Sequence, residues 1–83
     1  MKTTVEISKY PLDKNYKKPI KDFIARVNAY PNITVLTSGT NTQISGDYEA
    51  VLSLIQKEMK NSFEKYGKVV FVMKIFNGDL LNK

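Results

Sequence analysis

The chain begins with a stretch in which apolar and polar side chains alternate. In "TTVEISKYPL" (residues 3–12), Val5 and Ile7 alternate with polar side chains, which is the period of two expected for a β-strand. Glu6 and Ser8 therefore lie together on the polar face of this strand. If the strand is central in a small sheet, this polar face points toward a ligand, a partner chain or solvent.

Two later stretches show the three-and-four spacing of amphipathic helices. After a loop rich in Pro, Asp, Asn and Lys, Pro19 suits the first turn of a helix that ends at Pro31. We expect Asp47 to cap the start of the second helix and Gly67 to end it. The apolar side chains expected to face the core are Ile20, Phe23, Ile24, Val27 and Tyr30 in the first helix and Val51, Leu52, Ile55, Met59 and Phe63 in the second.

The remaining stretches predict three more strands. "NITVLTS" (residues 32–38) and "TNTQIS" (residues 40–45) flank Gly39 and predict a hairpin, and "KVVFVMKIF" (residues 68–76) predicts the last strand. The order β-α-β-β-α-β predicts an α+β, ferredoxin-like fold that forms one domain over residues 1–83. Right-handed crossovers give an antiparallel four-stranded sheet with both helices on one face. At its centre we expect strand one with either strand three or strand four.

The last strand is apolar on both faces, and such a strand is normally buried on both faces. The helices can cover only one of them. We therefore expect a second copy of the chain to cover the other face, in a dimer or a tetramer. The alternatives are an exposed apolar sheet or a cover of short terminal helices. One side of the strand carries Val69, Phe71, Met73 and Ile75, and the other carries Val70, Val72 and Phe76.

The composition argues against several classes of chemistry. The chain has no Cys and no His, so we expect no enzyme, no metal site and no cofactor. The net charge of +5 is spread along the chain, and Arg26 is the single arginine among 13 basic residues, which argues against nucleic-acid binding. The sequence shows neither a signal peptide nor a membrane-spanning run, so we expect a soluble, cytoplasmic protein without membrane insertion.

Two other modules of this fold stay open as alternatives. "FEKYGKVVFV" (residues 63–72) is similar to a segment of RNA-recognition motifs, but it follows the second helix, and strand one lacks the paired aromatic residues that such a motif needs. Regulatory domains that bind amino acids between subunits usually carry a glycine in the turn after strand one, and "PLDKNYKK" (residues 11–18) has none.

Polar residues on the sheet are candidates for a binding site. Glu6 and Ser8 share a face of strand one, and either Thr42 or Gln43, with Ser45, shares a face of strand three. Short hydroxyls and a carboxylate among apolar side chains suit a small heteroaromatic ligand. The alternative is a set of solvated residues on an open antiparallel face.

Several stretches together resemble the YkoF-like family of thiamine- and hydroxymethylpyrimidine-binding proteins. The matching pieces are "VEISKYPL", "PIKDFIARVNAY", "TQISGDYEAV" and "GKVVFVMKI", which cover nearly the whole chain in the right order. The resemblance implies a ferredoxin-like fold, dimers or tetramers formed through the sheets, and binding of thiamine or its pyrimidine without catalysis. It also implies a carrier, buffer or sensor, which could associate with a transporter system. An oligomeric structural domain without a ligand is the alternative.

The resemblance also suggests which residues hold the ligand. Glu6, Ser8 and Tyr10 fall in the family's first-strand motif. Thr42 matches the threonine of a "M-S-T" segment, in which Thr40 and Asn41 here replace the methionine and the serine. In the capture that we expect, the pyrimidine stacks beside Phe71 or Tyr10 and is hydrogen-bonded by Ser8 and Thr42. Glu6 either joins these hydrogen bonds or faces the thiazolium cation. The ligand would lie at the sheet face near a subunit interface.

Overall fold

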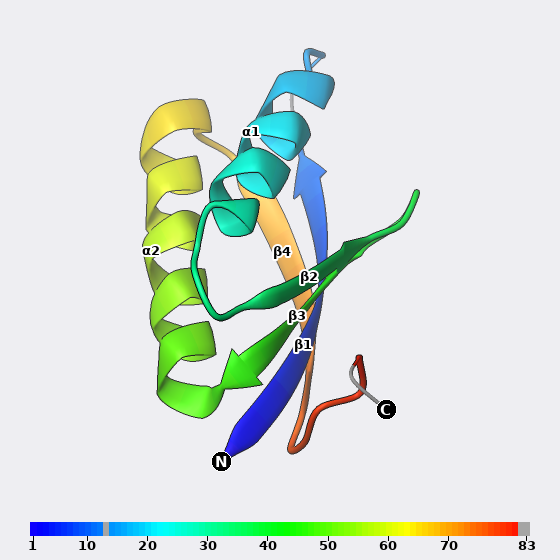
Figure 1. Cartoon of the computed structure of the whole chain (residues 1–83). Helices are drawn as coiled ribbons and strands as arrows, with labels where there is room; N and C mark the ends of the chain where they lie inside the picture. The colour runs from blue at the N-terminus through cyan, green and yellow to red at the C-terminus, as the bar shows by residue number, and fades with distance from the viewer. Residues whose placement is uncertain (13, 82–83) are drawn as a thin grey trace.

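A computed structural model of the chain describes residues 1–12 and 14–81 and shows one sheet packed against two helices (Figure 1). The strands are β1 (Lys2–Pro11), β2 (Thr34–Thr37), β3 (Thr42–Asp47) and β4 (Val69–Phe76), and the helices are α1 (Lys17–Asn28) and α2 (Tyr48–Tyr66). The strand order is β2-β3-β1-β4 and every neighbouring pair is antiparallel. This confirms the ferredoxin-like fold, with strands one and three at the centre.

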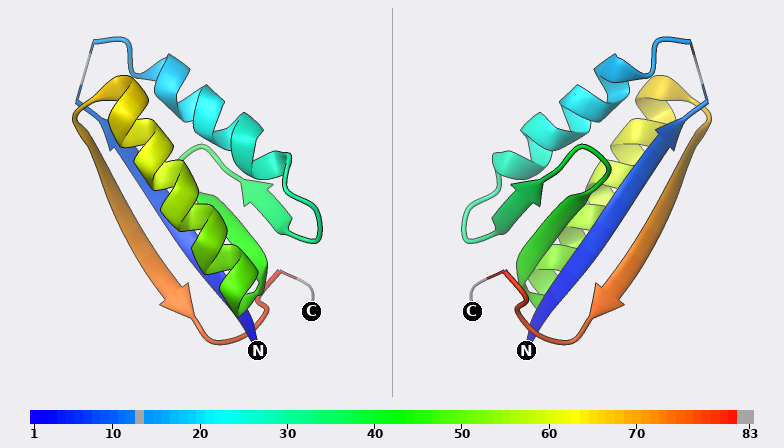
Figure 2. Two further views of the ribbon diagram at one scale, coloured as in Figure 1. Left: turned by 90° about the vertical axis from the view of Figure 1, so that its left-hand side faces the viewer. Right: turned by 90° about the vertical axis from the view of Figure 1, so that its right-hand side faces the viewer.

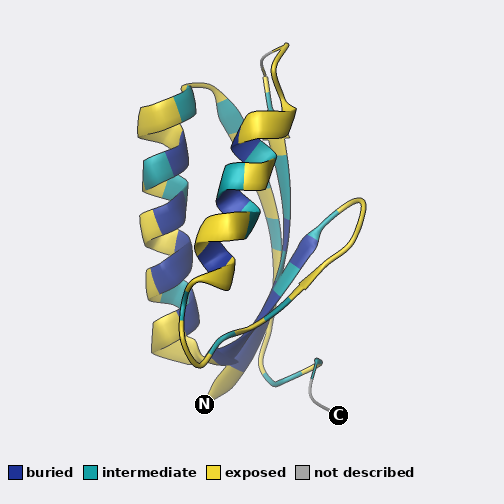
Figure 3. Cartoon of the chain, turned by 45° about the horizontal axis from the view of Figure 1, so that its top comes forward, coloured by how far each residue is buried: buried dark blue, intermediate teal, exposed yellow. Residues whose placement is uncertain are grey.

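The strand register assigns each side chain of β1 to one of the two faces. Val5 lies opposite Ile44 of β3 and Ile75 of β4, and Ile7 lies opposite Met73, all on the helix side. Figure 3 shows that the buried residues of the helices face this side of the sheet. The fully buried apolar core consists of Val5, Ile7, Phe23, Val27, Ile44, Val51, Leu54 and Ile55.

Both described helices lie on one face of the sheet, as the sequence predicts, and neither lies on the opposite face (Figure 2, right). Its exposed apolar side chains are about half accessible, with Val72 at 52% and Phe76 at 45%. Residues 77–81 fold back onto one end of this open face. There, Thr4 Oγ1 donates to the carbonyl oxygen of Gly78 at 2.8 Å and accepts from the Leu80 amide at 3.0 Å. Neither described helix is long and apolar enough to cross a membrane.

The ends of α2 lie where the sequence places them. Asp47 precedes the helix in an extended conformation, but its carboxylate makes no capping hydrogen bond and instead lies 3.1 Å from Lys2 Nζ. Gly67 ends the helix with a φ of 75°, a left-handed region that glycine enters without steric cost.

The buried face of α2 differs from the expected one. Val51 and Ile55 are buried as expected, whereas Leu52 and Met59 are only partly buried, and Phe63 is 48% exposed. The helix instead turns Leu54, Glu58 and Ser62 toward the sheet and α1. Each of the two polar residues has polar partners there, which offsets the cost of removing it from water.

Glu58 joins the two helices through a buried hydrogen-bonded cluster. Its side chain is only 4% exposed, against 45% for Arg26. Arg26 Nε donates to Oε1 at 2.5 Å, and the Tyr30 hydroxyl donates to Oε2 at 2.8 Å. The hydrogen bond from Tyr30 to this carboxylate, together with burial, raises the pKa of Tyr30. Both oxygens of the buried carboxylate are therefore satisfied by α1 and the residues that follow it.

We predict that Arg26→Met destabilises the protein although Arg26 is largely exposed. The substitution leaves the buried Glu58 carboxylate with Tyr30 as its remaining partner, which should lower the free energy of unfolding by about 1–3 kcal/mol. Urea denaturation at fixed protein concentration measures this. Lys57→Met, on the exposed surface of α2, is the charge-matched control and should change stability by less than about 0.5 kcal/mol. Equal effects of the two substitutions would contradict the assignment.

Candidate functional site

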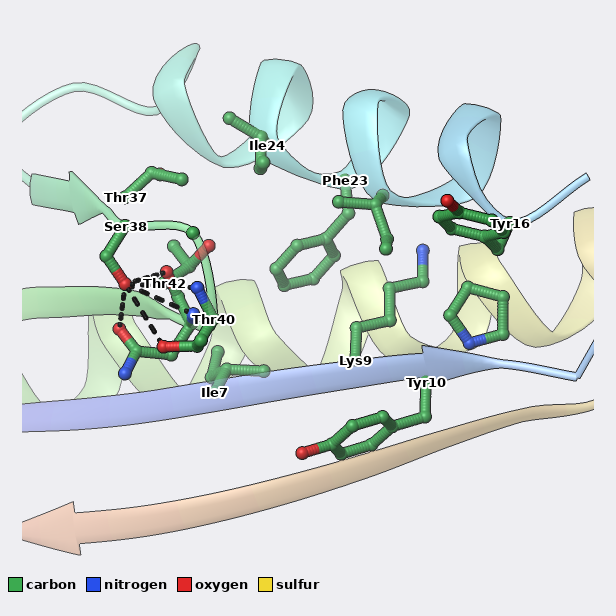
Figure 4. A pocket seen from close by; sticks show the side chains of 14 residues that line it. Ile7, Lys9, Tyr10, Tyr16, Phe23, Ile24, Thr37, Ser38, Thr40 and Thr42 are labelled. Carbon is green, nitrogen blue, oxygen red and sulfur yellow. Dashed lines mark hydrogen bonds between the residues drawn. The ribbon is translucent and has the colours of Figure 1, made fainter.

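A pocket lies between α1, the end of β1 and the turn at residues 38–41 that joins β2 to β3 (Figure 4). Its volume of about 440 Å³ falls within the range of sites for small organic ligands. Apolar side chains from β1 and α1 form much of its wall, and the hairpin supplies polar groups. The lining side chains central to its chemistry are Ile7, Lys9, Tyr16, Phe23, Thr40 and Thr42.

The hairpin wall of the pocket is a turn organised by Ser38. The Ser38 amide donates to the carbonyl oxygen of Asn41 at 2.9 Å. The Ser38 hydroxyl oxygen accepts hydrogen bonds from the amides of Thr40 and Asn41 at 3.3 Å each. Because the turn satisfies its own backbone groups, it holds Thr40 and Thr42 at the mouth and wall of the pocket without support from a helix.

Lys9 extends from the helix-facing side of β1 toward α1 (Figure 4). Its Nζ donates to the carbonyl oxygen of Pro19 at 2.7 Å and to Ser62 Oγ at 3.0 Å. It also lies 5.2–5.6 Å from the centroids of three aromatic rings, those of Phe23, Tyr66 and Phe71. Burial lowers the pKa of Lys9 to about 8, against the smaller opposing effects of Asp22 and Glu58.

Sequence reasoning did not select Lys9, although a signal for it was present. Lys9 has the same parity along β1 as Val5 and Ile7, so the alternation that buries those two side chains also turns Lys9 inward. A lysine at an inward strand position is uncommon unless its amine finds polar partners. Here α1 and α2 provide those partners.

Three of the expected ligand-binding residues lie on the open face instead. Glu6 lies across from Lys74, with 3.9 Å between Oε1 and Nζ, and Ser8 Oγ donates to the carbonyl oxygen of Thr40 at 3.4 Å. The ring of Tyr10 lies on the far side of β1 from Lys9 and Phe23 (Figure 4). The prediction that Glu6 and Ser8 share a sheet face away from the helices is therefore confirmed.

The other expected residues lie on the helix side of the sheet. Thr42 is opposite Ile7 and only 5% exposed, and Thr40 is in the hairpin turn. Phe71 is opposite Lys9, and its ring centroid is 5.7 Å from that of Phe23. The sequence left open whether Thr42 or Gln43 shares a face of strand three with Ser45. The register shows that Gln43 does, on the open face with Glu6.

The structure therefore does not bring the predicted residues together into one site. The sheet separates Ser8 from Thr42, so the expected hydrogen bonds from both side chains to one pyrimidine are not supported by this geometry. Thr40 and Thr42 line the pocket, Tyr10 also borders it although its ring lies on the far side of β1, and Phe71 packs beside it. Among the described residues, no group of three or more acidic, His or Cys side chains is arranged to hold a metal ion.

We predict that Lys9 makes stability depend on pH. Below pH of about 8 Lys9 is charged in the folded and the unfolded chain, and the cost of burying that charge is fully present. Between about 8 and 10.5 the folded chain binds fewer protons than the unfolded chain, so raising the pH favours folding. The unfolding free energy of the wild type minus that of Lys9→Met should therefore rise across this window.

Chemical denaturation of both proteins at several pH values between about 6.5 and 9.5 checks this prediction. The other titrating groups are common to the two proteins and cancel in the difference. A difference that stays constant across the range, or falls, would show that Lys9 keeps an ordinary pKa in the folded chain.

The architecture recurs in solved structures of low sequence identity. A protein from Streptococcus pneumoniae matches with a TM-score of 0.88 at 18% identity, covering 99% of this chain and 92% of that one. A protein from Thermotoga maritima, provisionally assigned to thiamine biosynthesis or salvage, gives 0.84 at 16% identity, covering 94% and 85%. A DUF77 domain of unknown function from Bacillus cereus gives 0.79 at 15% identity, covering 94% and 77%.

No protein-family model and no curated protein matches the sequence. The structural likenesses establish the fold. Because the sequence identities are low, the chemistry of the site has to be inferred from the residues of this chain.

Proposed function

We propose that this protein binds a small, flat heteroaromatic molecule, of the size of thiamine or its hydroxymethylpyrimidine portion, and releases it unchanged. The observation that carries the proposal is the pocket between α1 and the hairpin turn, whose volume of about 440 Å³ suits such a ligand. The absence of Cys and His from the chain supports binding without catalysis.

The lining of the pocket supports a planar ligand. Phe23 and Tyr16 on the α1 side offer aromatic surfaces against which a ring can stack. Thr40 and Thr42 on the hairpin side offer hydroxyl groups that donate to ring nitrogens or accept from an amino group. The same fold in a Thermotoga protein provisionally assigned to thiamine biosynthesis or salvage, and the motifs quoted above, favour a thiamine-related ligand.

The open sheet face suits a second copy of the chain. It carries exposed apolar side chains of β1 and β4, including Tyr10 and Val72. Near its middle, Glu6 and Lys74 lie side by side with opposite charges. A copy related by a two-fold axis that passes close to this pair would place the carboxylate of one chain against the ammonium group of the other while burying the apolar side chains. This supports a dimer, or a tetramer built from dimers.

A thermal-shift titration tests the binding function. We expect a saturable rise in melting temperature with thiamine or hydroxymethylpyrimidine, because a ligand at a hundredfold excess over its dissociation constant stabilises the folded state by about 2.7 kcal/mol. Adenine and an amino-acid mixture are the control ligands. Ile24→Trp, which fills the pocket, should abolish the shift, and Thr42→Val should weaken it.

Ser8→Ala is the matched control, because it removes a hydroxyl from the open face and should leave the shift intact. A shift lost in Ser8→Ala and kept in Ile24→Trp would move the site to the open face. If no ligand changes the melting temperature of folded, oligomeric protein, an oligomeric structural domain becomes the better description.

Light scattering after gel filtration tests the assembly. The wild type should elute as a dimer or tetramer, and Val72→Asp should yield monomers because it buries a charge in the interface. Ala50→Asp, on the exposed first turn of α2, adds the same charge and should leave the assembly unchanged. A monomeric wild type at high concentration would contradict the proposed pairing.

A further inference from the structure

The described lining of the pocket carries one charge, and that charge is positive. Lys9 is the single charged side chain among the described residues that line it, and no carboxylate does. Glu6, the carboxylate expected to face a thiazolium cation, lies across the sheet beside Lys74. A site that binds a cation normally offers a carboxylate or a cage of aromatic rings, and here the Phe23 ring already lies 5.2 Å from the Lys9 ammonium group. The charge on the lining of this pocket therefore does not favour a cationic ligand.

The ammonium group of Lys9 has no anionic hydrogen-bond partner among the described residues. Its two acceptors, the Pro19 carbonyl and the Ser62 hydroxyl, are both uncharged. The carboxylates that face it from the helices have other partners. Asp22 of α1 lies 3.4 Å from Lys65, and Glu58 of α2 accepts from Arg26 and Tyr30.

The other described side chains packed around Lys9 are aromatic. Tyr66 of α2 and Phe71 of β4 present aromatic rings to it. An ammonium group has three N–H donors, and the two hydrogen bonds to Pro19 and Ser62 leave one donor for another acceptor. A negatively charged ligand atom would supply both an acceptor and a counter-ion.

A second hollow on the other side of the start of α1 adds to the positive potential at this end of the molecule. Among the described residues that line it, Asp22 is the single carboxylate, and the basic residues are Lys17, Lys18, Lys21 and Lys65. The first turn of α1 carries no acidic residue, so the positive end of the helix dipole is not offset there. Potentials of this kind attract anions to a neighbouring concave site.

We propose that the ligand of this pocket carries a negatively charged group, such as a phosphate monoester or a carboxylate, and that the Lys9 ammonium is its counter-ion. This inference rests on the proposed binding function and specifies its ligand class: a planar ring with an anionic substituent, in preference to a neutral or cationic ring. The substituent points toward the β1 end of the pocket, where Lys9 lies.

The state of Lys9 in the free protein supports the same assignment. Burial holds its pKa near 8, so the charged amine is disfavoured there and an anion beside it would restore the usual preference for the charged form. Binding of an anion at a pH somewhat above 8 should therefore be accompanied by uptake of a proton. A neutral ligand gives no such coupling.

Isothermal titration calorimetry with matched ligands tests the inference. At about pH 7, hydroxymethylpyrimidine phosphate and thiamine monophosphate should bind the wild type roughly tenfold to a hundredfold more tightly than hydroxymethylpyrimidine and thiamine, the usual range for a charge-assisted hydrogen bond. Lys9→Met should reduce this ratio toward one. Lys57→Met, which removes the same charge from an exposed site on α2, should preserve it.

A second measurement needs no variant and so does not depend on the folding of Lys9→Met. Titration of the wild type at about pH 8.5 in buffers of different ionisation enthalpy should show net proton uptake with the phosphorylated ligand. The phosphate itself is fully ionised at this pH and contributes little. The unphosphorylated ligand should show none.

The outcomes separate this inference from the proposed function. Equal affinity for phosphorylated and unphosphorylated ligands, or a preference that survives in folded Lys9→Met, would overturn the role of Lys9 while leaving the binding function in place. Phosphate-dependent binding without proton uptake would likewise show that the anion lies away from Lys9. Binding of none of the four ligands would overturn both.

Discussion

The structure depends on the position of β1, which pairs with β3 on one edge and with β4 on the other. Its backbone groups are occupied on both edges, so its side chains are divided strictly between the helix side and the open side. Val5 and Ile7 enter the core, whereas Glu6 and Ser8 cannot reach it. A shift of register by one residue would exchange the two sets and remove both the core and the pocket.

Because Lys9 points inward, the elements that cover β1 must provide hydrogen-bond acceptors. Its amine needs acceptors on the helix side, and α1 and α2 supply them through Pro19 and Ser62. One turn earlier on α2, Glu58 accepts from Arg26 and Tyr30. The interface between the helices and the sheet is therefore apolar at its centre and hydrogen-bonded at this end. The pocket lies where those two regions meet.

Hydrophobic periodicity predicted the fold correctly because each change between the strand period and the helix period coincides with a boundary between elements. Gly67 ends α2 with a positive φ, as expected for a glycine at this position. The prediction for the buried face of α2 was wrong in part because it included only apolar side chains, whereas Glu58 and Ser62 are buried and have tertiary polar partners. The pocket was missed for the same reason. Its key residue is a lysine, which a search for apolar positions passes over. Which side chains of strand three face the helices depends on the geometry of the hairpin turn.

The hydrogen bonds of Thr4 to residues 77–81 divide the open face into two unequal parts. Thr4 is 4% exposed at the covered end of β1, whereas Tyr10 at the opposite end is 53% exposed. Along β1, the accessible part of the face therefore begins at Glu6 and runs toward Tyr10 and its β4 partner Val70, the end of the sheet that also borders the pocket. Chain pairing and ligand capture would thus occupy opposite sides of the same short length of β1, back to back across a single layer of backbone.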